Sequence, residues 1–314
     1  MKWPDMMDAT LINWTLSNIA APLEHFSHPS DMRSAVSKIK ELPPLPGIAE
    51  KVIKLAADPL ADAAKLASII ELDPILTTQV IRWASSPLYG FRGKITTVKD
   101  AISRVLGFDF VMNLALGLSA LQPLRAPKHG VIGTEMLWVQ SLAGTRLIKQ
   151  LNRQLMLEKQ TRPDVLFLSA LMHNIGFPLL GHEFPEEFLY LNKIISVNPT
   201  LNTFNIEQFT FGVDHTQLGA WLMTSWAMPK PILDIVYHHH NPYYRGEHYL
   251  LNLLVYLTDS LLGKLGIGDA QNQHCEDDVF VELGLDLKIC ESALNDINDV
   301  LPDIKATAAS LLGS

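Results

Sequence analysis

The 314-residue chain has only two cysteines, Cys275 and Cys290, and both lie near its C-terminal end. Two thiols cannot build a disulfide framework or a four-cysteine zinc site, so the sequence predicts a cytoplasmic protein of a reducing compartment. Basic residues are also scarce, because 25 Lys and Arg stand against 33 Asp and Glu, with a formal net charge of -8. A nucleic-acid binder needs a basic face to neutralise phosphates, so we expect no nucleic-acid partner.

Long apolar runs are missing as well. A run such as LLNLLVYL (250–257) is much shorter than the roughly 20 residues that a helix needs to cross a bilayer. The first residues, MKWPDMMDATLINWTL, lack the basic start and the small-residue cleavage site of a secretory signal. The sequence therefore predicts no membrane partner. What it does contain is 48% hydrophobic residues, which is enough for a large core.

The apolar residues that are present recur with the period of helices. The segment TVKDAISRVL (97–106) begins with a capping box of Thr97 and Asp100, and Gly107 follows it. Asp73 before a proline, and the PKP segment that begins at Pro229, mark two more helix starts. Alternating strand patterns of real length and hairpin signals such as Asn-Gly are not found. The sequence predicts an all-α fold.

Breaks in composition divide the chain into parts. A segment rich in proline and glycine, QPLRAPKHGVIG (122–133), separates two helical blocks, and a polar stretch, GDAQNQHCEDD (268–278), precedes a short tail. The predicted parts are an N-terminal extension (1–32) with a helix at about 8–26, a main domain (33–266) made of an N-terminal helical lobe (33–121) and a second lobe (134–266), and a C-terminal helical tail (267–314).

Several motifs recur in an order that resembles one known family. In the first block they are LPPLPGIAEKVIKLAADP, IIELDPILTTQVIRWASSPLYG and ITTVKDAISRVLG, and in the second LWVQSLAG, LFLSALMHNIG, VDHTQLGAWLMTSWAMP and IVYHHHNP. The run is similar to HDOD domains, the HD-related output domains of bacterial signalling proteins, over about residues 33–265. The resemblance implies an HD-domain-like helical bundle with an additional N-terminal helical lobe.

The same resemblance places a set of candidate site residues. HD-superfamily phosphohydrolases hold a metal with one histidine, an adjacent His-Asp pair and a later aspartate, and subgroups with two metals add further histidines. The matching positions in this chain are Gln140 for the first histidine, His173 and Asn174 for the pair, His215, His239 and His240 for the additional histidines, and Asp259 for the late aspartate. Two of the four core positions, Gln140 and Asn174, therefore carry replacements.

Both replacements weaken the predicted metal site. Divalent metals prefer a neutral imidazole or an anionic carboxylate. Asn174 offers only a neutral carbonyl oxygen, and Gln140 offers an amide where an imidazole nitrogen would bind. Activation of water depends on a metal held in a defined geometry, so the altered set argues against hydrolysis. In the segment SALMHNIGFPLLGHEF (169–184), Gly176 is expected to end the helix that carries His173.

The remaining candidates point to a polar cluster inside the protein. His239 and His240 continue the apolar face of the helix after Pro231, and Asp259 lies in an otherwise apolar helix. A buried carboxylate needs partners, which these histidines could supply. The cluster is either a remnant held by hydrogen bonds, a metal site without turnover, or a working catalytic site. We expect no cofactor, and Fe, Mn or Zn is the alternative.

The resemblance leads to three functional hypotheses. The first is a stand-alone output module of bacterial signal transduction that acts by binding other signalling proteins. The second is a metal-dependent phosphohydrolase that cleaves a nucleotide or a cyclic dinucleotide, and the third is a sensor that binds a nucleotide second messenger without cleaving it. The partner surface is predicted in a groove between the two lobes, near Trp83, Ser85 and Tyr89 of RWASSPLYG.

Overall fold

All regular secondary structure in the described part of the chain is helical. This computed structural model describes residues 35–36, 39, 42–56, 58–271 and 275–312. The prediction of an all-α fold is therefore confirmed for these residues. The helix predicted at about residues 8–26 lies outside them.

The N-terminal lobe is built from short helices whose starts follow the predicted caps. The carboxylate of Asp73 accepts from the backbone N–H groups of Ile75 and Leu76, and the hydroxyl of Thr97 accepts from the N–H of Asp100. The elements are α3 (Gly47–Ala56), α4 (Ala63–Ile70), α5 (Pro74–Ala84), the 3-10 turn η1 (Pro87–Tyr89), α6 (Val98–Asp100), the π-helical stretch η2 (Ala101–Leu106) and α7 (Phe108–Leu121).

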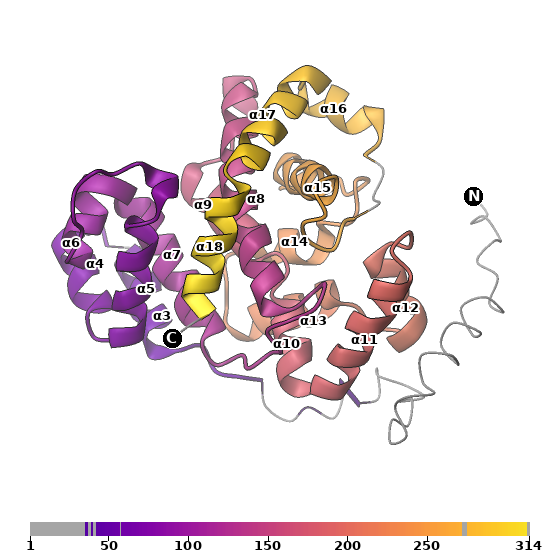
Figure 1. Cartoon of the computed structure of the whole chain (residues 1–314), viewed down its shortest axis with the longest axis horizontal. Helices are drawn as coiled ribbons and strands as arrows, with labels where there is room; N and C mark the ends of the chain where they lie inside the picture. The colour runs from indigo at the N-terminus through magenta and orange to yellow at the C-terminus, as the bar shows by residue number, and fades with distance from the viewer. Residues whose placement is uncertain (1–34, 37–38, 40–41, 57, 272–274, 313–314) are drawn as a thin grey trace.

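The second lobe surrounds one long helix, α8 (Thr134–Gln154). It packs against α9 on one side and α15 on another, while α10, α13 and α14 form a connected group around the turn after α9 (Figure 1). The other elements are η3 (Leu157–Lys159), α9 (Pro163–Met172), α10 (Gly176–Glu183), α11 (Pro185–Val197), α12 (Thr203–Phe211), α13 (His215–Ser225), α14 (Lys230–His238) and α15 (Tyr249–Gly263).

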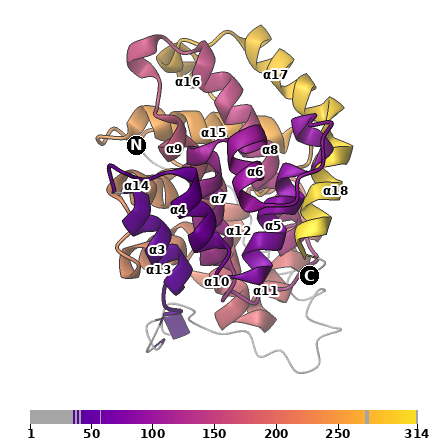
Figure 2. The ribbon, with the colours of Figure 1, turned by 90° about the vertical axis from the view of Figure 1, so that its left-hand side faces the viewer.

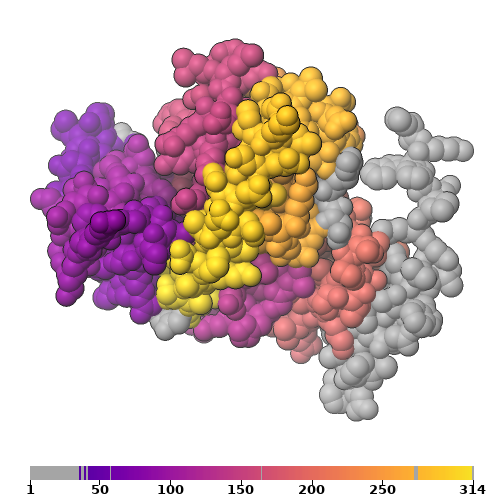
Figure 3. Space-filling view, turned by 45° about the horizontal axis from the view of Figure 1, so that its top comes forward, coloured from indigo at the N-terminus to yellow at the C-terminus, as the bar shows by residue number. Residues whose placement is uncertain are grey.

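The C-terminal tail packs against both lobes. It consists of α16 (Asp277–Leu283), α17 (Leu287–Asp299) and α18 (Leu301–Leu312). Helix α18 packs on α8 of the second lobe and on α5 of the first, and Figures 2 and 3 show it in yellow along this boundary. Donors from the first lobe and the connecting loop bind its last carbonyls, because Arg82 Nη1 lies 2.7 Å from the Ser310 oxygen and Lys128 Nζ lies 3.0 Å from the Leu312 oxygen.

A continuous apolar core joins these parts. Its largest fully buried side chains include Trp83 in the first lobe and Phe177 and Phe188 in the second. One helical stretch of the described residues, Val165–Glu183, is apolar and long enough to span a membrane by composition alone, but 89% of its window is buried inside the fold. Burial of this kind is typical of the core helix of a folded domain.

Candidate functional site

The predicted site residues come from five elements and meet inside the second lobe. Gln140 lies in the middle of α8, Asp259 lies in α15, and His215 is the first residue of α13. His173 and Asn174 occupy the turn after α9, and His239 and His240 follow α14 directly. Helix ends place most of these side chains, because a chain that leaves a helix can turn its polar groups inward without breaking the apolar stripe. All seven predicted positions are thus brought to one region.

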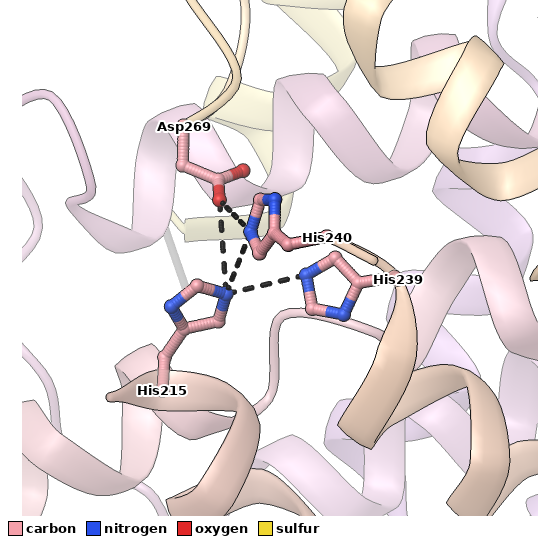
Figure 4. A group of neighbouring side chains, drawn as sticks. All are labelled: His215, His239, His240 and Asp269. Carbon is pink, nitrogen blue, oxygen red and sulfur yellow. Dashed lines mark hydrogen bonds and ion pairs between the residues drawn. The ribbon is translucent and has the colours of Figure 1, made fainter. Parts of the chain in front are cut away.

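One additional residue, Asp269, completes the arrangement. It lies in the loop after α15 and is 2% exposed. His215, His239, His240 and Asp269 each offer one ligand atom, and these four atoms lie within 4.8 Å of one another (Figure 4). We call these four residues the His–Asp cluster. They are the group of described residues that could hold a metal ion.

The spacing inside the His–Asp cluster fits ligands that converge on one point. Nε2 of His215 lies 3.2 Å from Nε2 of His239 and 3.2 Å from Nε2 of His240, and Asp269 Oδ2 lies 2.8 Å from His240 Nε2. Tetrahedral ligands at zinc–nitrogen distances of about 2.0–2.1 Å stand roughly 3.3–3.4 Å apart. Asp269 Oδ2 is buried without a hydrogen-bond partner among the described residues, despite its short distance to His240. Ligand atoms that converge in this way, with one carboxylate oxygen left without a partner, suit a shared cation.

Neighbouring acceptors orient two of these imidazoles. His215 Nδ1 lies 2.6 Å from the buried carboxylate of Glu207, and His239 Nδ1 lies 3.1 Å from the backbone oxygen of Val236. An Nδ1–H that donates to such an acceptor leaves the lone pair on Nε2, the nitrogen that faces the cluster. This second layer of contacts is the usual support of a metal-binding histidine. Glu207 is 1% exposed and was absent from the predicted set.

The charges of the cluster are strongly coupled. Burial disfavours a charged imidazole, but the carboxylates of Glu207 and Asp269 outweigh it and raise the pKa of His215 to about 9. Burial, together with the neighbouring histidines, lowers the pKa of His239 well below its usual range. Burial opposes the charge of Asp269 too, yet His240 and His215 hold the pKa of this carboxyl well below its usual range. A metal that binds here must displace the proton of His215.

The other predicted residues form a second group, which we call the amide cluster: Gln140, His173, Asn174 and Asp259. The Gln140 amide nitrogen donates to Asp259 Oδ1 and to Asp269 Oδ1, both at 3.2 Å. The Asn174 amide nitrogen donates to Gln140 Oε1 at 3.0 Å and to Asp269 Oδ1 at 2.8 Å. Amide N–H groups therefore point at both carboxylates, where a cation would otherwise neutralise them.

The amide cluster nevertheless keeps two buried oxygens without hydrogen-bond partners among the described residues. These are Asn174 Oδ1 and Asp259 Oδ2. His173 Nε2 is 3.4 Å from Asp259 Oδ2, and burial raises the pKa of Asp259 despite this histidine. One imidazole, one carboxylate and neutral amide oxygens are a weaker ligand set than the three imidazoles and one carboxylate of the His–Asp cluster. The residues present fit a metal at the His–Asp cluster better than at the amide cluster.

Two glycines allow the backbone to approach this site closely. The expectation that Gly176 ends a helix is wrong: α9 ends at Met172, and Gly176 is the first residue of α10. A Cβ on Gly176 would lie 1.8 Å from the backbone oxygen of His215. Gly268, with φ +82°, is equally confined, because a Cβ there would lie 2.5 Å from the Gln140 side chain. Close contact, rather than helix termination, explains Gly176.

The residues of the predicted groove belong to neither cluster. Trp83 is fully buried, with ring centroids 6.1 Å from Phe110 and 6.5 Å from Trp138, and its indole nitrogen donates to Tyr89 Oη. Ser85 is exposed, whereas its neighbour Ser86 is buried and pairs with Thr307 of α18 at 2.7 Å. A partner cannot reach the Trp83 ring in this conformation.

Comparisons with known proteins agree with this architecture. The sequence-family model of the HDOD domain matches residues 42–242 of this chain. A crystal structure of a candidate signal transduction protein from Marinobacter aquaeolei VT8 has a TM-score of 0.77 and 29% identity, and the match covers 96% of this chain and 66% of that one. An HDOD domain protein of unknown function from Geobacter sulfurreducens has a TM-score of 0.70 and 20% identity, covering 89% and 96%.

Two further relatives extend the comparison. A candidate metal-dependent phosphohydrolase from Shewanella amazonensis SB2B has a TM-score of 0.58 and 20% identity, covering 94% of this chain and 99% of that one, which shows a shared fold. An uncharacterised protein of Treponema pallidum (strain Nichols) is 22% identical over 220 residues, 69% of this chain and 41% of the relative. This chain thus spans less than half of that relative. Because the HDOD model matches more than half of its length, the chain belongs to the HDOD domain family.

Proposed function

We propose that this HDOD protein is a signal-transduction module that acts by binding another protein, and that its His–Asp cluster holds one divalent metal ion as a structural element. The observation that carries the proposal is the replacement of core ligands by Gln140 and Asn174, whose amide nitrogens donate to Asp259 and Asp269. Hydrogen-bond donors in these positions stabilise the two carboxylates without a second cation, so the two-metal arrangement of a phosphohydrolase is not supported.

The enclosure of the His–Asp cluster also favours a structural metal. Catalytic zinc sites keep one coordination position for water or substrate, whereas structural sites fill all four positions with protein ligands. The cluster offers four protein ligands, and the side chains of His215 and Asp269 are 0% exposed while that of His240 is 7% exposed. Three imidazoles and one carboxylate suit zinc or iron, and manganese less well. A bound ion would tie α13, α14 and the loop after α15 together.

Names of similar structures leave the enzyme hypothesis as the rival. The Shewanella protein is described as a metal-dependent phosphohydrolase, and the Marinobacter protein as a signal transduction protein. The signalling hypothesis agrees with the replacement of two core metal ligands by Gln140 and Asn174. This replacement is observed in the chain itself and does not depend on the names of similar proteins. Binding of another protein, the stand-alone arrangement and a cytoplasmic location are predictions that rest on the family resemblance.

Elemental analysis and a phosphodiesterase assay on the full chain, purified without chelator, test the proposal. We expect about one metal ion per chain, and no turnover of bis(p-nitrophenyl) phosphate or of cyclic dinucleotides. The double variant Gln140→His with Asn174→Asp, which restores the ligand types of the HD core, should raise the content toward two ions per chain. Turnover by the unaltered chain that disappears in His173→Ala would show an enzyme and refute the proposal.

The protein-binding part of the proposal needs its own test. Affinity capture with the full chain, followed by pairwise reconstitution with the purified candidate partner, should give a saturable complex. Metal removal should weaken that complex only as far as it loosens the fold, because the cluster is buried. Failure of every candidate to bind in the reconstituted pair, while the chain is folded and metal-loaded, would contradict action through protein contact.

A further inference from the structure

Two adjoining pockets lie where α8 of the second lobe meets the first lobe. The larger, of about 430 Å³, lies between α7, α8 and α9, and three phenylalanines line it: Phe108, Phe110 and Phe167. We call it the ring pocket. The smaller, of about 290 Å³, lies beside η1, and three cations of α8 line it: Arg146, Lys149 and Arg153. We call it the basic pocket.

The two pockets share part of their walls. Four residues line both of them: Phe110, Thr145, Lys149 and Arg153. One elongated molecule can therefore extend from the ring pocket into the basic pocket. No residue of the His–Asp cluster or of the amide cluster lines either pocket, so this region is separate from the candidate metal site.

The basic pocket concentrates positive charge in a chain whose formal net charge is -8. Its cations follow one another at i, i+3 and i+7 along α8, a spacing that places them on one face of the helix. The described residues that line this pocket include no aspartate and no glutamate. The pocket therefore favours an anion.

Two of these cations have no counter-charge. The side chains of Lys149 and Arg153 form no ion pair and no hydrogen bond with another described residue, and both are exposed to solvent. Partial burial, followed by the charge of Arg153, lowers the pKa of Lys149. Like charges four residues apart on a helix repel each other. A phosphate monoester, with nearly two negative charges and several acceptor oxygens, would neutralise both cations.

The ring pocket suits the uncharged part of such a molecule. Its volume falls within the range of about 300–1,000 Å³ that is usual for small-molecule sites. Phe108 and Phe110 are half-buried, so part of each side chain is open to a planar group. Asp109 is the one carboxylate among the described lining residues. It repels a phosphate at this end and accepts hydrogen bonds from hydroxyl or amino groups.

We infer that the two pockets bind one phosphate monoester that carries a planar ring, the class to which nucleoside monophosphates belong. The phosphate lies between Lys149 and Arg153 in the basic pocket, and the ring lies against Phe108 and Phe110 in the ring pocket. Such a ligand contacts both lobes and stabilises their relative position. The inference goes beyond the proposed function and holds whether or not the His–Asp cluster contains a metal.

Three probes test the inference on the full chain. Adenosine 5′-monophosphate (AMP) has both the phosphate and the ring, ribose 5-phosphate lacks the ring, and adenosine lacks the phosphate. Titration calorimetry should give saturable binding of one AMP per chain, roughly tenfold tighter than either of the other two. Added salt should weaken the binding of AMP and not that of adenosine. AMP should also raise the melting temperature with concentration.

Two variants separate the phosphate end from the ring end. Lys149→Gln should weaken AMP and ribose 5-phosphate by roughly tenfold and leave adenosine unchanged. Phe108→Leu keeps an apolar side chain but removes the ring, so it should weaken AMP and adenosine and leave ribose 5-phosphate unchanged. Lys51→Gln is the matched control, because Lys51 is an exposed lysine of α3 that lines neither pocket.

A metal-site variant guards against binding elsewhere. His239→Gln removes a ligand of the His–Asp cluster and should bind AMP as the unaltered chain does. Loss of AMP binding in this variant would place the phosphate at the metal and overturn the inference. It would also be overturned by equal affinity for AMP and either of the other probes, by no binding of AMP at millimolar concentration, or by unchanged binding in the double variant Lys149→Gln with Arg153→Gln.

Discussion

The His–Asp cluster and the amide cluster lie side by side and are equally buried, yet their chemistry differs. In the His–Asp cluster, three imidazole nitrogens converge, with Nε2 of His215 at 3.2 Å from Nε2 of His239 and from Nε2 of His240. In the amide cluster, Gln140 and Asn174 form a connected set of hydrogen bonds with the carboxylates. A buried charge can be balanced by a cation or by amide donors. The amide cluster uses amide donors, and a cation is what we propose for the His–Asp cluster.

Asp269 connects the two clusters. Its Oδ1 accepts from the amides of Gln140 and Asn174, while its Oδ2 faces His240 and His215. One carboxylate thus takes part in both arrangements. A substitution of Asp269 should therefore affect both clusters. A substitution of a residue that belongs to one cluster alone should affect that cluster and leave the other unchanged.

The largest expected effect is that of Asp269→Ala. It leaves buried histidines and two amides without their shared acceptor, so the free energy of unfolding should fall by about 3–5 kcal/mol. Metal content should fall in the same variant. Guanidinium denaturation and elemental analysis measure the two effects, with Asp296→Ala, an exposed aspartate of α17, as the control. A variant with wild-type stability would mean that Asp269 does not join the clusters.

The second prediction compares His239 with His173, which have the same local setting. In each, Nδ1 faces the backbone oxygen four residues earlier, at 3.2 Å from Ile235 and 3.3 Å from Ser169. His239→Gln removes a ligand and should weaken metal binding by more than about 100-fold, whereas His173→Gln should weaken it by less than about tenfold. Competition with a fluorescent zinc chelator measures both. Equal losses would mean that the two clusters share the ion.

The third prediction concerns pH and the metal-free chain. The pKa of His215 is raised to about 9 in the folded protein, against about 6.5 in an unfolded chain. Its proton therefore adds stability below pH 6.5, and this stability is lost as the pH rises through 9. The free energy of unfolding of the metal-free chain should fall by about 1–3 kcal/mol from pH 6.5 to 9. The metal-loaded chain should lack this decline, since the metal replaces the proton. Denaturation at several pH values measures both forms, and a flat profile without metal would contradict the assignment.

The smallest effect is expected from Glu207→Gln. The carboxylate of Glu207 orients His215 from outside the cluster, so its loss should weaken metal binding by about tenfold and leave the amide cluster unchanged. Asp234→Asn is a matched control, because Asp234 pairs with His248 at 2.8 Å in another part of the lobe. Competition with a zinc chelator measures the metal affinity of both variants. An equal effect in both variants would indicate a general loss of charge rather than a contact with His215.

Much of the fold follows from local sequence. The caps at Asp73 and Thr97 form as the sequence predicts, because a short polar side chain before an apolar helical stripe satisfies the free N–H groups of the first turn. The family motifs also select residues that the structure brings together, since Gln140, His173 and Asp259 lie in contact. The prediction for Gly176 is wrong because a glycine after a helix resembles a stop, whereas Gly176 makes close contact with the backbone of His215.

Asp269 and Glu207 could not be recognised in the same way. Asp269 lies in a polar stretch whose composition is typical of an exposed loop. In the structure it is buried and directly follows Gly268, which has a positive φ. Glu207 did carry a signal: it shares the buried face of α12 with Thr203 and Thr210. A carboxylate on such a face requires a partner, but the sequence does not indicate that the partner is His215, eight residues later.

The position of Asp269 has a practical consequence for work on fragments. The HDOD match ends at residue 242, whereas Asp269 and Asp259 lie beyond it. A protein trimmed to the matched boundaries would keep His215, His239, His240 and Glu207 and lose both Asp259 and Asp269. It would also lose α18. A low metal content measured on such a fragment would result from the loss of Asp269 and would not show that the full chain binds no metal.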